Sequence, residues 1–153
     1  MSKAFTRDDD TAQEAELPER AISPHPNLVT AEALAQIEAA IARLSEEQGR
    51  ARIAGATTAA ASTARDLRYW SARRATAQLT EPKPGPQVQF GSRVTIKRSD
   101  GATRVYRIVG TDEGDPAQGT LSYASPLAQA LMGKEIAETV VVGGHEQDVV
   151  QVA

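Results

Sequence analysis

The sequence contains no cysteine, only two histidines, and aromatic residues amounting to 4 % of the chain. Without cysteine, a disulfide scaffold, a thiolate metal site and a cysteine nucleophile are all excluded. The two histidines, His25 and His145, lie far apart in the sequence and leave little for a histidine metal site. No apolar run approaches the roughly 20 residues that span a bilayer, and the aspartate-rich N-terminus lacks the apolar segment of a secretory signal. We therefore expect a cytoplasmic protein without a membrane segment or a bound metal.

A chain of 153 residues with 41 % hydrophobic content can bury one modest core and carry an appended helical arm. Its 17 basic and 20 acidic residues give a net charge of −3, so the overall charge does not identify a nucleic-acid binder. Residues 1–22 have few large apolar side chains and include the run Asp8–Asp10. Such a segment cannot offset its chain entropy by burial, so we expect a disordered acidic tail there.

Residues 28–80 have the pattern of two helices that form an antiparallel hairpin. Thr30 is a good N-cap for the first helix, and Glu32 lies in its first turn. Apolar residues then follow at helical spacing, and Gly55 is the best candidate for the reversal. A second, alanine-rich helix is predicted from Thr57 to about residue 79. The apolar stripe of the first helix consists of Leu34, Ile37, Ile41 and Leu44, and the prolines that make residues 81–87 a stiff linker are Pro82, Pro84 and Pro86.

Residues 88–153 change to the alternating pattern of strands. Asp100-Gly101 is typical of a two-residue type I′ turn, which pairs Ile96 with Val105 and Thr95 with Tyr106. Further strands are predicted at Thr103–Val109, Thr120–Tyr123, Thr139–Val142 and Asp148–Val152, with a short helix after Ser125-Pro126. The sequence therefore predicts an α+β protein, with a helical hairpin followed by a small antiparallel sheet that carries one short helix.

Residues 106–142 resemble the C-terminal domain of the Gre transcription elongation factors, with motifs in family order. The shared residues are the run Tyr106 to Gly110, Asp112, Glu113, Asp115, Ser122, Ser125 to Leu127, Ala130, Leu131, Gly133, Lys134, Val140 and Val141, with Phe90, Gly91 and Val94 ahead of them. The match covers about residues 88–152, and residues 28–44 resemble the start of the family's N-terminal coil.

This resemblance implies a coiled coil followed by an FKBP-like domain that docks at the rim of the RNA polymerase secondary channel. The implied partner is RNA polymerase, any contact with nucleic acid is indirect and within the elongation complex, and we expect a monomer. The polymerase-docking candidates are Asp112, Glu113, Asp115, Ser125, Pro126, Leu127 and Lys134.

The predicted tip of the coil departs from the family. Gre factors carry acidic residues there, and these help to hold a catalytic Mg²⁺ in the polymerase. The corresponding candidates here are neutral, and the coil is shorter, as in Gre-related proteins similar to the regulator of nucleoside diphosphate kinase. We therefore expect an elongation regulator that does not stimulate transcript cleavage. The coil-tip candidates are Ala54, Gly55, Ala56 and Thr57.

Other interpretations remain open for the helices. Four arginines within ten residues of the second helix form either a basic face for polymerase or RNA, or ordinary solvated side chains: Arg65, Arg68, Arg73 and Arg74. The coil alternatively binds a partner unrelated to polymerase, which makes the protein an adaptor. Catalysis of prolyl isomerisation is disfavoured because residues 88–153 contain only three aromatic residues. We expect no enzyme activity, no catalytic residues and no cofactor.

Overall fold

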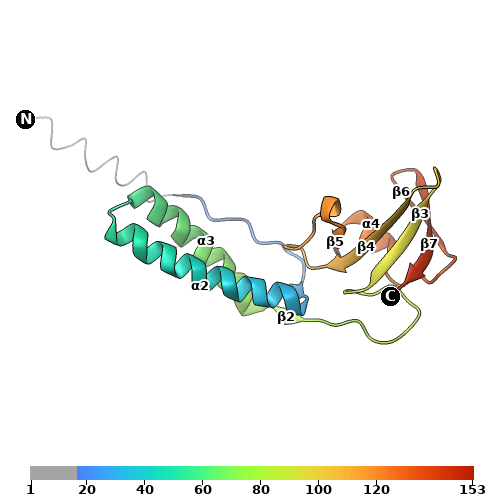
Figure 1. The fold of residues 1–153 in the computed structure, drawn as a ribbon, viewed down its shortest axis with the longest axis horizontal. Coiled ribbons are helices and arrows are strands. Elements are labelled where there is room, and N and C mark those ends of the chain that lie inside the picture. The colour runs from blue at the N-terminus through green and yellow to red at the C-terminus, as the bar shows by residue number, and fades with distance from the viewer. Residues whose placement is uncertain (1–16) are drawn as a thin grey trace, which may run out of the picture. The chain divides into compact units, whose positions relative to one another are not determined.

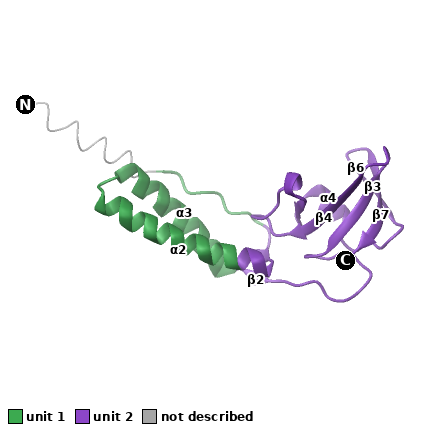
Figure 2. Cartoon of the chain, in the orientation of Figure 1, with its two compact units in different colours: residues 1–24, 35–76 green, residues 25–34, 77–153 purple. Residues whose placement is uncertain are grey.

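The computed structural model describes residues 17–153, which divide into two compact units (Figure 1, Figure 2). The described part of unit 1 comprises residues 17–24 and 35–76, and unit 2 comprises residues 25–34 and 77–153. The predicted disorder of residues 1–16 lies outside the described residues. No helix of the described chain is long and apolar enough to cross a membrane.

The predicted helical hairpin is confirmed. Helix α2 spans Ala31–Ile53 and helix α3 spans Thr57–Thr76. Thr30 caps α2, since its hydroxyl oxygen accepts a hydrogen bond from the Ala33 N–H at 3.1 Å. Ile37 and Leu44, seven residues apart on one helical face, are buried.

The helices reverse at Gly55, as predicted. Gly55 adopts a left-handed conformation with a φ of 69°. The Ala56 N–H donates to the Ala51 carbonyl at 2.9 Å, and the Gly55 N–H donates to the Arg52 carbonyl at 3.2 Å. These two bonds are the Schellman motif, which satisfies the last carbonyls of α2 and favours glycine at this position.

Residues 17–22 belong to the segment predicted to be a disordered tail. They contain no helix or strand, and Glu19 and Arg20 form ion pairs with Arg68 and Asp66 of α3. Composition alone does not reveal these charge pairs, which join residues more than 40 positions apart, and the disorder of this segment stays a prediction.

Two short strands lie at the ends of the hairpin and belong to unit 2. Strand β1 (Leu28–Val29) pairs in parallel with β2 (Gln78–Leu79). The Gln78 N–H donates to the Asn27 carbonyl at 2.9 Å, and the Thr80 N–H donates to the Val29 carbonyl at 3.0 Å. The second helix therefore ends at Thr76 and not near residue 79, because the following residues exchange helical bonds for this ladder.

The rest of unit 2 is a five-stranded sheet in the order β5-β4-β3-β7-β6. Its strands are β3 (Arg93–Arg98), β4 (Thr103–Val109), β5 (Thr120–Ser122), β6 (Thr139–Val142) and β7 (His145–Val152). Three ladders are antiparallel, as predicted, whereas β4 and β5 are parallel. The chain between β4 and β5 crosses back through the short helix η1 (Pro116–Gln118), and that crossover makes parallel pairing possible.

The register of the β3–β4 hairpin differs from the prediction by one residue. Thr95 pairs with Val105, and Ile96 pairs with Arg104. The turn has three residues between Arg98 and Ala102, with Gly101 at a φ of 86°, instead of a two-residue type I′ turn. An Asp-Gly pair suits both turns, because the longer one also needs a left-handed residue at its end.

Helix α4 (Pro126–Leu131) connects β5, at one edge of the sheet, to β6 at the other. Ala128 and Leu131 of this helix are fully buried. They pack in one hydrophobic core to which all five strands of the sheet contribute. Its larger buried members include Val88, Phe90, Val94, Ile96, Ile108, Leu121, Val140 and Val149. The predicted α+β class is confirmed, while the FKBP-like description stays a prediction.

Candidate functional site

The tip of the hairpin is exposed and carries no carboxylate. All four coil-tip candidates, Ala54 to Thr57, are exposed, and the neighbouring Ile53 has 90 % of its surface exposed. The sequence contains no Asp or Glu between Glu47 and Asp66. The tip therefore presents apolar and hydroxyl groups, with Arg50 and Arg52 in the last turn of α2.

The carboxylates nearest to this tip already have basic partners. Glu47 accepts a hydrogen bond from Arg43 at 3.0 Å, and Asp66 pairs with Arg20 at 3.4 Å. Residues 17–153 contain no group of three or more His, Asp or Glu side chains that could hold a metal ion. The hairpin by itself therefore offers no ligand set for a cation.

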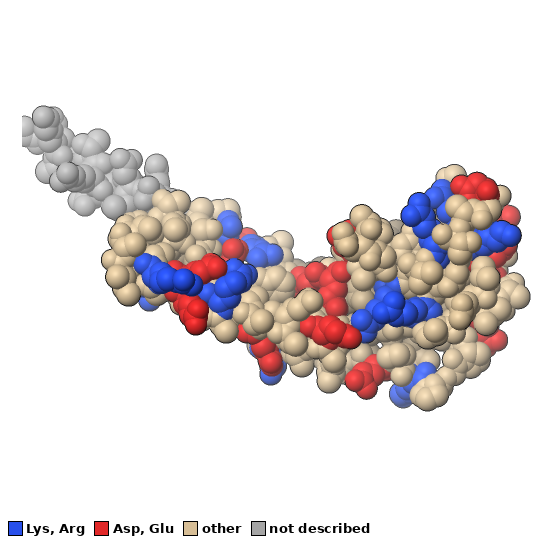
Figure 3. Space-filling view, viewed as in Figure 1, with Lys and Arg blue, Asp and Glu red and all other residues tan. Residues whose placement is uncertain are grey.

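The four arginines of α3 do not form one exposed basic face. Arg73 is buried, with 2 % of its surface exposed. Arg68 pairs with Glu19 at 2.6 Å, Arg74 pairs with Glu38 at 3.0 Å, and Arg65 lies 3.7 Å from Asp66. On the face drawn in Figure 3, basic and acidic side chains lie beside one another along the helices. Most of this positive charge is therefore balanced within unit 1.

Glu113, a polymerase-docking candidate, is partly buried and makes two contacts within unit 2. Its carboxylate accepts a hydrogen bond from the Thr30 hydroxyl at 2.6 Å and another from the Gly110 N–H at 3.0 Å. Thr30 is also the N-cap of α2, so Glu113 fixes the hydroxyl that caps the helix. The structure therefore gives Glu113 a bracing contact within unit 2, and its role in docking stays a prediction.

The other acidic candidates lie in the same loop between β4 and β5. Asp112 is exposed. Asp115 caps η1, since its carboxylate accepts from the Ala117 N–H at 3.2 Å. Of the three acidic candidates, Asp112 and Asp115 are exposed, and Glu113 is partly buried.

The candidates around α4 combine structural and surface positions. The Ser125 hydroxyl accepts from the Ala128 N–H at 3.3 Å and caps the helix, and Pro126 occupies its first turn and is exposed. Leu127 packs against the core while remaining partly exposed. The carbonyl of Lys134 accepts from the Val88 N–H at 2.8 Å, which fixes the chain just after α4.

An open groove beside Lys134 was not predicted. It has a volume of 470 Å³ and lies between α4 and β6. Val141, which lines the groove, has 63 % of its surface accessible. Ile136, two residues after Lys134 in the sequence, has 57 % of its surface accessible. The alternation of strand β6 could have predicted the outward direction of Val141, but not that an exposed position would be apolar. The residues that line the groove are Gln129, Ala130, Met132, Lys134, Thr139, Val140 and Val141.

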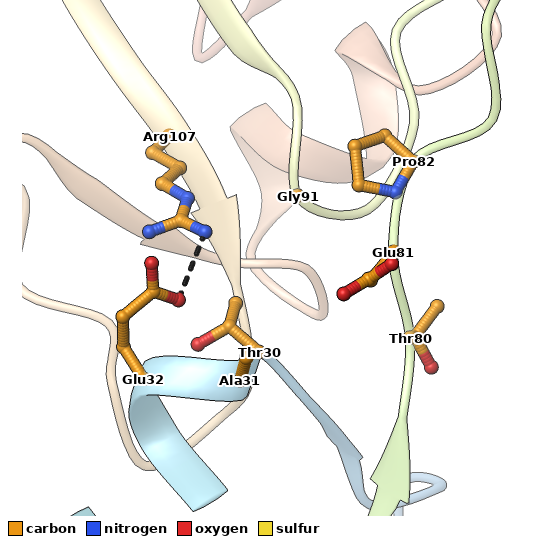
Figure 4. Close-up of a pocket in the computed structure, with 8 residues that line it drawn as sticks. All are labelled: Thr30, Ala31, Glu32, Thr80, Glu81, Pro82, Gly91 and Arg107. Carbon is orange, nitrogen blue, oxygen red and sulfur yellow. Dashed lines mark hydrogen bonds and ion pairs between the residues drawn. The ribbon is translucent and has the colours of Figure 1, made fainter. Parts of the chain in front are cut away.

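A second unpredicted pocket, of 280 Å³, lies at the start of α2 within unit 2 (Figure 4). Arg107 of β4 donates to the Glu32 carboxylate at 3.2 Å across it. The backbone N–H of Glu32 and, next, the Arg107 guanidinium hold the pKa of this carboxyl below its ordinary value. The remaining residues that line the pocket are Thr30, Ala31, Thr80, Glu81, Pro82 and Gly91.

This pocket joins groups from three separate parts of the sequence. Arg107 was singled out as part of a strand and of the family-like run Tyr106 to Gly110, and Glu32 as a first-turn acid. The ion pair neutralises the charge that each would present alone, and Glu81 adds further negative charge. The arrangement therefore braces the start of α2 and shows no cluster of donors that would recognise a particular small molecule.

The sheet-containing part of the chain is similar to known proteins. The family model described as "Transcription elongation factor, GreA/GreB, C-term" matches residues 83–152. The transcription elongation factor GreB of Pasteurella multocida is 39 % identical over 80 residues, which are 51 % of this chain and 51 % of the relative. GreA of Nitratidesulfovibrio vulgaris is 48 % identical over 59 residues, which are 38 % of this chain and 37 % of the relative.

These relatives are matched over only part of their sequences, since the chain spans about half the length of the curated relatives or less. Among solved structures, the GreA factor homolog 1 of Thermus thermophilus has 16 % sequence identity and a TM-score of 0.42. That alignment covers 82 % of this chain and 97 % of the other.

Proposed function

We propose that the protein binds RNA polymerase and regulates elongation, because residues 83–152 match the family model of the GreA/GreB transcription elongation factors. The observation that carries the proposal is the family match over the whole of the five-stranded sheet and α4. The relatives with 39 % and 48 % identity are themselves named transcription elongation factors. In this proposal the sheet unit docks on the polymerase, and the protein works as a cytoplasmic monomer without catalysing a reaction itself.

The proposed docking surface combines the accessible members of the sequence motif. Asp112 and Pro126 are exposed, and Leu127 and Lys134 are partly exposed. Glu113, Asp115 and Ser125 then act as supports, because their side chains accept hydrogen bonds from neighbouring groups of unit 2. An accessible charge beside a partly exposed apolar residue is typical of the rim and centre of a protein interface.

We further propose that the hairpin enters the secondary channel without stimulating transcript cleavage. Direct support of a Mg²⁺ ion needs an oxygen ligand about 2.1 Å from the metal, usually a carboxylate. Asp66 is eleven residues from Gly55, which places it about 16 Å along the helix from the reversal. It also pairs with Arg20, so extending it toward a metal would first require that this contact break.

The binding proposal is tested with purified RNA polymerase and the full chain. We expect Asp112→Lys to weaken binding several-fold, mainly through slower association, because charges at an interface rim act on the encounter rate. Glu146→Lys is the matched control, since Glu146 is an exposed acid of β7 outside the family motif. Absence of binding by the unaltered chain would contradict the proposal and favour the adaptor interpretation.

The channel proposal is tested on backtracked elongation complexes. The protein alone should give no cleavage above the intrinsic rate, and it should reduce the cleavage stimulated by a Gre factor in a concentration-dependent manner. Strong cleavage by the protein alone would show that a carboxylate of the hairpin reaches the metal. If a large molar excess of the protein did not reduce this cleavage, the proposal that it shares a binding site with Gre factors would be wrong, while the proposal of polymerase binding would stand.

A further inference from the structure

Residues 17–20 lie along the hairpin within unit 1, and we name this segment the strap. The Glu19 carboxylate accepts hydrogen bonds from Arg68 Nε at 2.9 Å and from Arg68 Nη2 at 2.6 Å. This two-point geometry is the strong form of an arginine–carboxylate contact, because both donors of the guanidinium fork are used at once. The strap is therefore attached to α3 in a defined orientation.

The next residue of the strap covers the aromatic pair of α3. The Arg20 guanidinium carbon lies 3.9 Å from the centroid of the Tyr69 ring and 5.6 Å from that of Trp70. Its Nη1 also lies 3.4 Å from a carboxylate oxygen of Asp66. A guanidinium over an aromatic face is attractive and shields that face from water, so Tyr69 has only 8 % of its surface exposed.

Leu17 provides an apolar contact at the other end of the strap. It lines a groove of 310 Å³ together with Gln48 and Arg52 of α2, while α3 contributes small side chains and Arg68. Small side chains on α3 leave room for a leucine side chain between the two helices. The residues contributed by α3 are Thr57, Ala60, Ala61, Ala64 and Arg68.

These contacts define a strap that is specific in geometry but weakly held. The Arg68 and Glu19 side chains are 54 % and 62 % exposed, and the Arg20 and Asp66 side chains are 38 % and 30 % exposed. Ion pairs this open to solvent are screened by salt and contribute little each. Ordinary changes in salt concentration can therefore shift the equilibrium between the attached and the detached strap.

We propose that residues 17–20 are an electrostatic strap that closes over the Tyr69–Trp70 face of the hairpin and opens as ionic strength rises. Opening frees the Arg68 fork, uncovers the two aromatic rings and removes Leu17 from the lining of the groove. This inference is independent of the proposed polymerase binding, because it concerns contacts within unit 1 only.

Trp70 provides a direct test, because it is the only tryptophan in the chain and lies beneath the strap. The measurement is quenching of its fluorescence by acrylamide in the full chain. Raising NaCl from about 0.01 M to about 1 M shortens the Debye length from about 30 Å to about 3 Å, and we expect quenching to increase over this range. In Glu19→Gln the ratio of open to closed strap should rise about two- to fivefold at low salt, as expected for loss of an exposed ion pair.

Glu47→Gln is the matched control, because it removes the same charge from another exposed arginine pair of unit 1, with Arg43. Its quenching should follow that of the unaltered chain at every salt concentration. The double variant Glu19→Gln/Arg68→Gln should be no more open than Glu19→Gln alone, since both changes remove one interaction. Equal quenching of Glu19→Gln and Glu47→Gln at low salt would overturn the strap, as would quenching that does not change with salt.

Discussion

At the scale of single residues, Gly110 shows how closely the chain packs around the start of α2. A Cβ atom at this position would lie 2.4 Å from the carbonyl oxygen of Leu28, which is closer than van der Waals contact allows. The Gly110 N–H also donates to Glu113, which accepts the Thr30 hydroxyl on its other oxygen. Glycine at 110 therefore allows residues 28–30 and the loop after β4 to meet.

We expect Gly110→Ala to lower the free energy of unfolding by about 1–3 kcal/mol, as for other overpacked positions. Gly49→Ala is the control, because Gly49 lies within α2 with nothing within 4 Å of its added Cβ. That change should raise the free energy of unfolding by about 0.5–1 kcal/mol through higher helix propensity. Urea denaturation measures both, and equal stabilities of Gly110→Ala and the unaltered chain would contradict the close approach.

The sequence could predict parts of this arrangement but not the contacts themselves. Thr30 was correctly predicted as a helix cap, because capping depends on residues three positions away. Its contact with Glu113 joins residues 83 positions apart, and no local pattern reveals such a pair. Glu113 was predicted as a docking residue from the resemblance to the Gre C-terminal domain, and that resemblance did not reveal its contact with Thr30.

At the scale of elements, α4 is a short helix whose stability depends on packing. A helix of six residues is too short to be stable alone, so its cap and its buried face must hold it. Ser125 provides the cap, and Ala128 and Leu131 provide a fully buried face against the sheet. The sequence predicted this element well, because a Ser-Pro start and a following glycine mark both of its ends.

Leu131→Ala should reduce the free energy of unfolding by about 2–5 kcal/mol, because it leaves a cavity in the core of unit 2. Val141→Ala, at a β6 position with 63 % of its surface exposed, should change it by less than about 0.5 kcal/mol. Chemical denaturation followed by far-ultraviolet circular dichroism compares the two. A cost for Leu131→Ala as small as that for Val141→Ala would mean that α4 does not pack on the sheet.

The β3–β4 hairpin shows where prediction of an element from sequence reaches its limit. Asp100-Gly101 correctly marked the turn, and the strand Thr103–Val109 was found with its observed bounds. The register was wrong by one residue, because both candidate turns place glycine in a left-handed conformation. The alternation of apolar and polar residues does not decide the register either, because apolar residues such as Val105 also occur at exposed positions; 54 % of the surface of Val105 is accessible.

At the scale of the whole molecule, each unit has an acidic side chain stabilised in its charged form. In unit 1, hydrogen bonding to Arg68 is the main cause that lowers the pKa of Glu19, and the charges of Arg68 and Arg65 add to it. In unit 2, its own backbone N–H and then Arg107 lower the pKa of Glu32. Both carboxyls have an ordinary pKa of 4.5, so both release their protons more readily in the folded chain.

This predicts a loss of stability in acid. A carboxyl with a lowered folded-state pKa contributes stability that is fully present above its unfolded pKa of 4.5 and is lost as the pH falls through the folded value. Glu19→Gln and Glu32→Gln should therefore each reduce the dependence of the melting temperature on pH below 4.5, with little change in its slope above pH 6. Glu146→Gln, at an exposed β7 position, is the control. If the melting temperatures of Glu19→Gln and Glu32→Gln depended on pH below 4.5 as strongly as that of the control, the prediction would be refuted.

The parallel pair of β1 and β2 has a consequence for how such a chain can change. The two segments that enter and leave the helices are fixed beside each other by backbone bonds, so residues 35–76 form an insertion between two anchored points. Residues added in equal number to both arms would lengthen the insertion without altering these anchors. Seven residues in each arm would move the Gly55 reversal about 10 Å further from its base. The reach of the hairpin is therefore an adjustable length that mutation can alter separately from the five-stranded sheet.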